Sequence, residues 1–455
     1  MSESDDRSRE AAREGQRSPY ARDPRHWSSD PELQRQRLED QVEIIRGAFP
    51  DVEVELAGGP PDGTERMAPG APQHLYRSSR LLVRDADLAR VDAVLGGNPR
   101  TVQRRVDKRA RGDGPGMVNG LTSYVVQPER TTLEALDRID RELGVGVATP
   151  DHLLYVTSNA GCCPATEPEQ ADRTTPDPPV NTDATTSGRG VLVSVVDTGL
   201  QTGLVESSPH TWVRGIEGDP ETSDPARLRH YVGHGTFVAG VVRTMAPQAQ
   251  VYVDGFLPTG GAVYESEIIR QLGEALERVP DIICLSAGAW TRRGLPLMSF
   301  EVFYETRLRH LSGTVLVAAA GNDGNRGPFW PAAFPWALAV GALDADGPGG
   351  AARAWYTNYG SWVDVYARGT DVVNVFPEGE YFYEEAPHKG QTATFAGGLA
   401  TWSGTSFATP LVAGLIAGRM SRTGENAQDA AAALRLLARE HAQPGVGPIL
   451  RPGMS

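Results

Sequence analysis

Residues 404–414 read G-T-S-F-A-T-P-L-V-A-G, and this stretch is the strongest single indication of the fold. A glycine, which lets backbone and substrate approach closely, precedes Ser406, and the apolar run 411–416 follows shortly afterwards. Pro410 is compatible with a helix because it falls in the first turn. The stretch therefore predicts a buried helix that opens at a serine. An ordinary helix-capping role would explain only the serine.

Upstream of this helix, short apolar runs alternate with helical segments. The runs cover residues 191–196, 251–256, 281–286, 315–320 and 339–343, and a last helix is expected over 427–441. Strands that are apolar throughout are typical of a parallel sheet with helices on both faces. The sequence thus predicts an α/β fold with a doubly wound parallel sheet in a catalytic domain of residues 189–455.

Functional side chains in such sheets gather at the carboxyl ends of the strands. Asp197 ends the run G-V-L-V-S-V-V, and His234 opens a helix in G-H-G-T-F-V-A-G. A serine hydroxyl is a poor nucleophile at neutral pH, so a histidine must take its proton and a carboxylate must hold that histidine. We expect Ser406 to be the nucleophile, His234 the general base and acid, and Asp197 the residue that orients His234.

Each motif is less specific alone than in combination. D-T-G at Asp197 also marks aspartic peptidases, but these need two facing carboxylates, and D-T-G occurs only once in this chain. A histidine between two glycines, as at His234, has little packing purpose. Asn322, in V-A-A-A-G-N-D-G, follows an apolar run. Its amide and the Ser406 N–H are the expected donors to an oxyanion.

Together, and in the order Asp, His, Asn, Ser, these segments resemble the subtilisin (subtilase) family over about residues 189–422. The resemblance implies a subtilisin-like fold and a serine endopeptidase acting through an acyl-enzyme on Ser406. It also implies a substrate site of two pocket walls and one edge that pairs with an extended peptide. The implied walls are Ser286, Ala287 and Gly288 on one side and Ala318, Ala319, Ala320 and Gly321 on the other, and the edge includes Thr259, Gly260 and Gly261. Judged from the residues alone, residues 286–288 could equally be an ordinary strand end, and the edge could equally be an ordinary loop.

The chain also departs from the family pattern. Ala287 replaces a more usual Leu, Arg368 stands where a Pro usually follows Ala, and residues 377–399 lengthen the approach to the nucleophile. Substrate preference is therefore not transferable from the family. No acidic cluster resembles a calcium loop, so we expect no metal and no cofactor.

The N-terminal half carries a different pattern. Residues 1–30 are polar and highly charged, as in a disordered segment, and residues 159–188 have the Pro- and Thr-rich composition of a linker. Between them, residues 31–158 predict a helix, a strand over 52–56 and a small α/β unit. The expected order of that unit is strand 79–83, helix 86–95, strand 123–127, helix 132–143 and strand 153–156. A basic stretch within 100–111 is read as a solvated loop.

This element order is similar to the ferredoxin-like propeptides of subtilases, which assist folding and block the active site. The resemblance implies an N-terminal domain that acts as an intramolecular inhibitor. An unrelated accessory or partner-binding domain would fit the same element order.

The bulk composition narrows the function further. A net charge of −14 argues against nucleic acid as a partner, because phosphate binding needs surplus Lys and Arg. No apolar signal segment and no run of about 18 apolar residues is visible, so we expect a cytoplasmic protein without a membrane partner. Cys162, Cys163 and Cys284 are expected to be free thiols.

Two alternatives to an endopeptidase stay open at this point. A peptide-binding pseudopeptidase would use the same groove as a scaffold, although it would require a defect in the triad. An esterase with little peptidase activity would use the same residues. Peptide or protein substrates are the expected partners of the favoured function.

Overall fold

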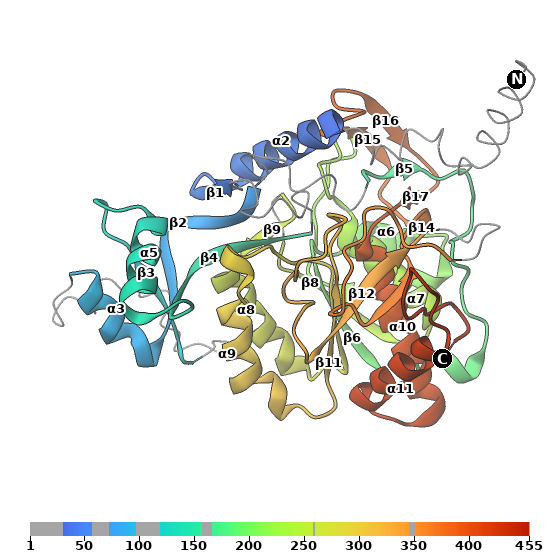
Figure 1. The fold of residues 1–455 in the computed structure, drawn as a ribbon. Coiled ribbons are helices and arrows are strands. Elements are labelled where there is room, and N and C mark those ends of the chain that lie inside the picture. The colour runs from blue at the N-terminus through green and yellow to red at the C-terminus, as the bar shows by residue number, and fades with distance from the viewer. Residues whose placement is uncertain are drawn as a thin grey trace, which may run out of the picture.

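The computed structural model describes residues 31–56, 72–96, 119–156, 166–257, 260–344 and 351–454. These residues form an N-terminal unit, residues 31–156, that lies beside a larger C-terminal unit, residues 166–454 (Figure 1). The predicted disordered segment 1–30, the basic stretch 100–111, Cys162, Cys163 and Thr259 lie outside the described residues.

A 7-stranded parallel sheet is the centre of the C-terminal unit, with the strand order β13-β12-β11-β10-β6-β8-β7 (Figure 1). The strands are β6 (Leu192–Asp197), β7 (Glu217–Gly218), β8 (Gln250–Gly255), β10 (Ile282–Leu285), β11 (Val315–Ala319), β12 (Ala337–Leu343) and β13 (Val365–Arg368). From β6 the chain adds β8 on one side, with the short β7 at that edge, and β10 to β13 in turn on the other, so the predicted doubly wound parallel sheet is confirmed.

Helices cover both faces of this sheet. One face carries α7 (His234–Met245), α10 (Thr405–Thr423) and α11 (Ala427–Glu440), and the other carries α8 (Glu265–Ala275) and α9 (Met298–Thr306). Because side chains alternate along a strand, Ile282 and Cys284 pack under the first group, whereas Ile283 and Leu285 pack under the second. Cys284 is a free, buried thiol.

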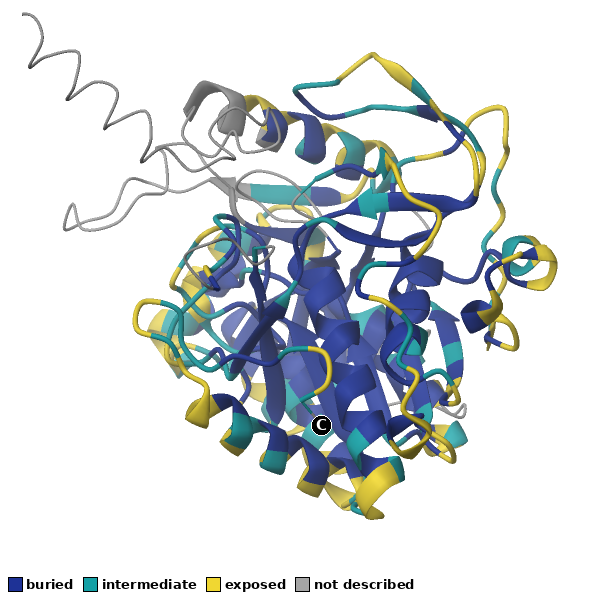
Figure 2. Cartoon of the chain, turned by 90° about the vertical axis from the view of Figure 1, so that its right-hand side faces the viewer, coloured by how far each residue is buried: buried dark blue, intermediate teal, exposed yellow. Residues whose placement is uncertain are grey.

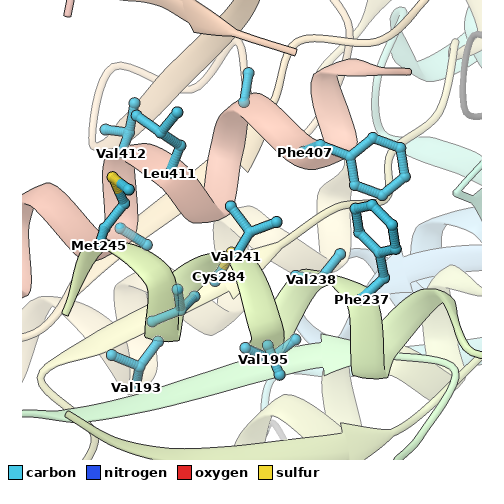
Figure 3. Packing of buried hydrophobic residues seen from close by; sticks show 14 of the residues in the cluster. Val193, Val195, Phe237, Val238, Val241, Met245, Cys284, Phe407, Leu411 and Val412 are labelled. Atoms are coloured by element: carbon cyan, nitrogen blue, oxygen red, sulfur yellow. The ribbon is translucent and has the colours of Figure 1, made fainter. Parts of the chain in front are cut away.

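The predicted buried helix is α10, which lies next to α7. Its residues are buried from Thr405 almost to its end, and buried residues gather in the sheet and the helices beside it (Figure 2). Phe407, Leu411 and Val412 of α10 pack with side chains of α7 above the sheet (Figure 3). The helices approach closely at Gly414, where a Cβ atom would lie 2.5 Å from Cβ of Met245. This packing holds the start of each helix in a defined place at the sheet.

Smaller strands complete the C-terminal unit. β14 (Val372–Val375), β17 (Leu399–Trp402) and β5 (Glu169–Gln170) form one sheet, and β15 (Gly379–Phe382) pairs with β16 (Thr392–Phe395). A short helix, α6 (Thr202–Ser207), follows β6. The β15–β16 hairpin accounts for much of the unusual segment 377–399.

Residues 166–188, which belong to the predicted linker 159–188, pack against the C-terminal unit. Besides the pairing of β5, the backbone of Asp177 exchanges hydrogen bonds of 3.0 and 2.8 Å with Val373. The Asp177 carboxylate accepts two hydrogen bonds from the Arg368 guanidinium, at 2.6 and 3.0 Å. Arg368, a departure from the family pattern, thereby anchors this segment, which is therefore not a free tether.

The N-terminal unit contains every element predicted for it. These are α2 (Pro31–Ala48), β1 (Val52–Leu56), β2 (Pro72–Arg84), α3 (Leu88–Val94), β3 (Leu121–Val125), α5 (Thr132–Leu143) and β4 (Ala148–Tyr155). A capping box of Thr131 and Glu134 starts α5. β4 pairs antiparallel with β9 (Ala262–Tyr264), which belongs to the C-terminal unit, so one sheet crosses between the units. The ferredoxin-like assignment stays a prediction.

Candidate active site

The predicted acid and base of the triad are hydrogen-bonded to each other. Asp197 is the last residue of β6, and His234 is the first of α7, where Gly233 with φ 78° turns the chain into the helix. His234 Nδ1 donates to Asp197 Oδ1 at 2.7 Å, and the Thr198 N–H donates to the same oxygen at 2.8 Å. Both side chains are fully buried. A carboxylate in this position holds the imidazole by Nδ1 and leaves Nε2 for proton transfer.

Ser406 is the second residue of α10, whose start packs against the His234 ring. That ring packs against Trp402 and Phe407, with ring centroids 5.3 and 5.4 Å away, and these residues bracket Ser406 in the chain. Within the described residues, neither His234 Nε2 nor Ser406 Oγ has a hydrogen-bond partner, although both atoms are buried. Hydrogen bonds of this kind often form only when substrate binds.

Asn322 is held in one orientation by the residue before Ser406. Its Oδ1 accepts both the backbone N–H and the hydroxyl of Thr405, each at 2.8 Å. The amide oxygen is thus occupied, and Nδ2 is the atom left to donate to a substrate. Ser286 Oγ donates to the Ser406 carbonyl at 3.0 Å, which ties one predicted pocket wall to Ser406.

A partly buried carboxylate that the sequence did not single out supports the turn before His234. Glu221 Oε2 accepts the Gly233 N–H at 2.9 Å and the Gln201 side-chain amide at 3.1 Å. Burial raises the pKa of Glu221 to about 7, and the nearby Asp197 charge acts in the same direction, while the two hydrogen bonds oppose the rise. In the sequence, Glu221 is one of several acidic residues in a polar loop, and no motif or periodic pattern distinguishes it from the others.

A small cavity beside Ser406 brings several predicted residues together. Its lining consists of Ser286, Ala287, Gly288, Ala319, Gly321, Asn322, Thr405 and Ser406, together with Tyr155, Val156 and Phe329. Ala318 and Ala320, also predicted here, are not part of the lining, because side chains alternate along β11 and beyond it. Ala318 packs in the core under α8 and α9, and Ala320 packs with Leu343 and Tyr366. Four residues of the lining were not predicted: Thr405, Tyr155, Val156 and Phe329.

A model of the subtilase family matches residues 188–443. This chain belongs to the subtilase family. The family and the subtilisin-like fold expected from the motifs are thereby confirmed.

Several curated proteins resemble this subtilase over about half of its chain. It is 30% identical over 244 residues to M-protease of Shouchella clausii (strain KSM-K16), a match that covers 51% of this chain and 54% of that protein. Subtilisin Savinase of Lederbergia lenta is also 30% identical over 244 residues, covering 51% and 76% respectively. The intracellular serine protease of Paenibacillus polymyxa is 30% identical over 250 residues, covering 51% and 67%. The chain spans about half the length of M-protease.

Among solved structures, fervidolysin from Fervidobacterium pennivorans, a keratinolytic enzyme related to subtilisin, has a similar fold. The TM-score is 0.54 at 18% sequence identity, and the match covers 83% of this subtilase and 61% of fervidolysin. At this identity the likeness concerns the fold alone.

The subtilase's own N-terminal unit places a strand beside the cavity. Tyr155 exchanges two hydrogen bonds of 3.0 Å with Gly288, and the Val156 N–H donates to the Gly261 carbonyl at 2.9 Å. Gly288 belongs to a predicted pocket wall and Gly261 to the predicted substrate-pairing edge. Gly260, also predicted for that edge, lines a separate cavity with residues of α2. Residues 153–156 therefore lie as an added strand between the wall and the edge.

A buried polar cluster fastens the same two units further from Ser406. Arg292 of the C-terminal unit donates from Nη1 to Asp140 of α5 at 2.7 Å, and its backbone N–H donates to His152 Nε2 at 3.1 Å. His152 Nδ1 donates to Glu265 at 2.9 Å. Burial and the Arg292 charge lower the pKa of His152 to about 3, and burial raises the pKa of Glu265 to about 7. His152 is thus a neutral donor and acceptor between the units.

Helix α2 makes a third contact between the units, on the segment 377–399. The Asp40 carboxylate accepts the Ala386 N–H at 3.1 Å and the Lys389 ammonium at 2.6 Å. Arg37 Nε donates to the Ala386 carbonyl at 2.5 Å. Residues 377–399, which precede the Ser406 motif, therefore also form a docking surface for the N-terminal unit.

The described ranges contain no candidate for a metal site or a membrane span. No group of three or more His, Cys, Asp or Glu side chains in them is placed to hold a metal ion. Likewise, no helix among the described residues is long and apolar enough to cross a bilayer.

Proposed function

We propose that this subtilase is a serine endopeptidase that cleaves peptides and proteins through an acyl-enzyme on Ser406. His234 takes the Ser406 proton during attack on the carbonyl and then gives it to the leaving amine. Asp197 orients His234 and stabilises the imidazolium. Water attacks the acyl-enzyme in the second half of the reaction, again with His234 as the base. The 2.7 Å hydrogen bond from His234 Nδ1 to Asp197 carries this proposal, because it leaves Nε2 of the buried imidazole for proton transfer.

The oxyanion of the tetrahedral intermediate would accept hydrogen bonds from Asn322 Nδ2 and the Ser406 backbone N–H. The two hydrogen bonds from Thr405 to Asn322 Oδ1 support this role, because they fix the amide before the substrate arrives. Preorganised donors of this kind stabilise developing charge without reorganisation at the moment of reaction.

The substrate would bind as an extended strand between Gly261 and Gly288. Main-chain hydrogen bonds to both edges give affinity with modest demands on the peptide sequence. Residues 153–156 support this mode, because Tyr155 and Val156 of this chain already make such hydrogen bonds.

The same strand supports a role of the N-terminal unit as an intramolecular inhibitor. A peptide and residues 153–156 cannot both occupy the space between Gly261 and Gly288, so substrate would have to displace the strand. The Arg292–Asp140 ion pair and the contacts of α2 would hold the unit in place. Activity would then depend on undocking or removal of the unit.

A cytoplasmic location belongs to the same proposal. It is supported by the match to a protein named intracellular serine protease. Immunodetection in the cytoplasmic fraction and in the medium of the producing cells would test it, and protein found only in the medium would contradict it.

A fluorophosphonate probe tests the assignment of the nucleophile. We expect the wild-type chain to be labelled and Ser406→Ala to remain unlabelled. Ser421→Ala is a matched control on the same helix α10, because Ser421 lies at its far end and bonds within the helix at 2.8 Å. Equal labelling of Ser406→Ala and wild type would overturn the assignment. His234→Ala should also abolish peptide hydrolysis.

The alternatives predict different outcomes in the same assays. Peptide binding without labelling, even after the N-terminal unit has been removed, would favour a pseudopeptidase. Labelling with turnover of esters but not of matched amides would favour an esterase.

A further inference from the structure

An aromatic ring lies between the two walls of the cavity beside Ser406. Phe329 lines this cavity with Gly288 on one wall and Gly321 on the other. A Cβ atom on Gly321 would lie 3.0 Å from Phe329 Cδ1, tighter than ordinary contact, and a Cβ atom on Gly288 would collide with Phe329 Cε1. The ring therefore touches the backbone of both walls, and only glycine leaves room for it at these positions.

The Phe329 ring is fixed in this place. Its side chain is 2% exposed, and it packs edge-on against Trp290, with ring centroids 5.6 Å apart, and against Tyr155, at 6.3 Å. The next residue, Trp330, exchanges backbone hydrogen bonds of 3.1 and 2.7 Å with Ala289, directly after the wall. The pairing fixes the backbone next to Phe329, and Trp290 and the backbone of both glycine walls enclose the ring, so it stays in the cavity when residues 153–156 leave.

The geometry points to Phe329 as the residue that restricts the substrate side chain at the attacked carbonyl, the P1 residue, to Ala, Ser or Thr. This inference rests on the proposed peptidase function and names its substrate class. A Leu or Phe side chain at P1 would need the space between Gly288 and Gly321 that the ring fills. The described residues that line the cavity include no Asp, Glu, Lys or Arg, so a charged P1 side chain would be buried without a partner.

A peptide series tests this restriction on the full chain. The substrates are peptide anilides that share the sequence Leu-Tyr-Val, which is that of residues 154–156, directly before the P1 residue. The P1 residue is Ala, Thr, Leu, Phe or Arg, and kcat/KM is compared across the series. We expect wild type to prefer Ala over Phe by about 10²-fold or more, and Phe329→Ala to reduce that ratio by about tenfold or more. The ratio of two substrates on one enzyme does not depend on how much of the enzyme is inhibited by its N-terminal unit.

Phe334→Ala is the matched control. Phe334 is a buried aromatic residue 5% exposed, close to Phe329 in the chain but absent from the cavity lining, so its loss should leave the Ala to Phe ratio unchanged. A wild-type preference for Leu, Phe or Arg at P1 would overturn the inference even if Phe329→Ala failed to fold. If the enzyme hydrolyses these peptides but prefers Leu, Phe or Arg at P1, the proposed peptidase function still holds and only the P1 inference fails. Absence of both hydrolysis and Ser406 labelling would remove the proposed function and this inference with it.

Discussion

Replacing Asp140 by alanine should loosen the N-terminal unit far more than replacing Asp137, although both carboxylates contact the Arg292 guanidinium. The side chains of Arg292 and Asp140 are 7% and 5% exposed, whereas Asp137 is 58% exposed. Removing one partner of a buried ion pair costs about 3 to 5 kcal/mol, because the other charge stays buried. Removing an exposed partner costs about 1 kcal/mol or less. We take about 3 kcal/mol for Asp140→Ala, since Asp137 remains near Arg292.

The rate at which a fluorophosphonate labels Ser406 in the full chain reports this loss. If residues 153–156 must leave before the probe enters, only molecules with an undocked N-terminal unit are labelled. As long as most molecules are docked, the labelling rate is then proportional to the undocked fraction. About 3 kcal/mol then corresponds to labelling about 10²-fold faster than wild type, and about 1 kcal/mol to about fivefold. Both variants lie on α5 and leave the C-terminal unit unchanged, so the chemistry at Ser406 is the same in each.

Glu142→Ala is the matched control for these variants. Glu142 also lies on α5, but its ion pair with Arg138 joins two partly exposed side chains of the same helix. Its labelling rate should equal that of wild type. Thermal unfolding would show that each variant is folded, and intact mass would show whether the chain has been cut. Equal rates for Asp140→Ala and Asp137→Ala in folded, uncut protein would refute the reasoning.

Three further perturbations have defined outcomes. Asn322→Ala should lower kcat on peptides by about 10²- to 10³-fold with little change in KM, the loss that a subtilisin shows without such a donor, and an unchanged kcat would exclude Asn322 from the oxyanion site. Leu411→Ala, at a fully buried position of α10, should lower the free energy of unfolding by about 2 to 5 kcal/mol in urea titrations, and a loss below about 1 kcal/mol would contradict the packing described. His230 lies 3.2 Å from Glu167 and 3.0 Å from Glu385; burial lowers its pKa, but the two carboxylates outweigh burial and raise the pKa to about 10. Because this value lies above the ordinary His pKa of 6.5, the stabilisation is complete below about pH 6.5 and is lost as the pH rises towards 10. The Tm of wild type should therefore fall more between pH 7 and 10 than that of His230→Gln, and parallel Tm curves would disprove this account.

Local patterns in the sequence predicted the parts of the fold that depend on neighbouring residues. The apolar runs that became β6, β10 and β11 and the capped helix α5 all have a periodicity or a start signal within a few residues. The proposed triad rests on patterns of the same kind. Asp197, His234 and Ser406 each sit in a short motif at a strand end or a helix start, and the topology of a doubly wound sheet brings such positions together.

The same patterns could not separate Ala319 from Ala318 as pocket residues. Both lie in one run of alanines, and only the direction in which the strand presents each side chain distinguishes them. The residues 166–188 were similarly ambiguous, since their Pro-rich composition describes a tether and a packed extended segment equally well. Pairing with β17 and with Arg368 made them part of the C-terminal unit.

By itself, then, the sequence determined the family and the parallel sheet and singled out the candidate triad, because motif order and apolar periodicity are properties of the chain. Only the tertiary structure decided what surrounds Ser406. Phe329 between two glycine walls, Tyr155 and Val156 against Gly288 and Gly261, and Asp140 under Arg292 are contacts between segments distant in sequence. Such contacts depend on where each loop and strand comes to lie in space, and no local pattern of residues specifies that.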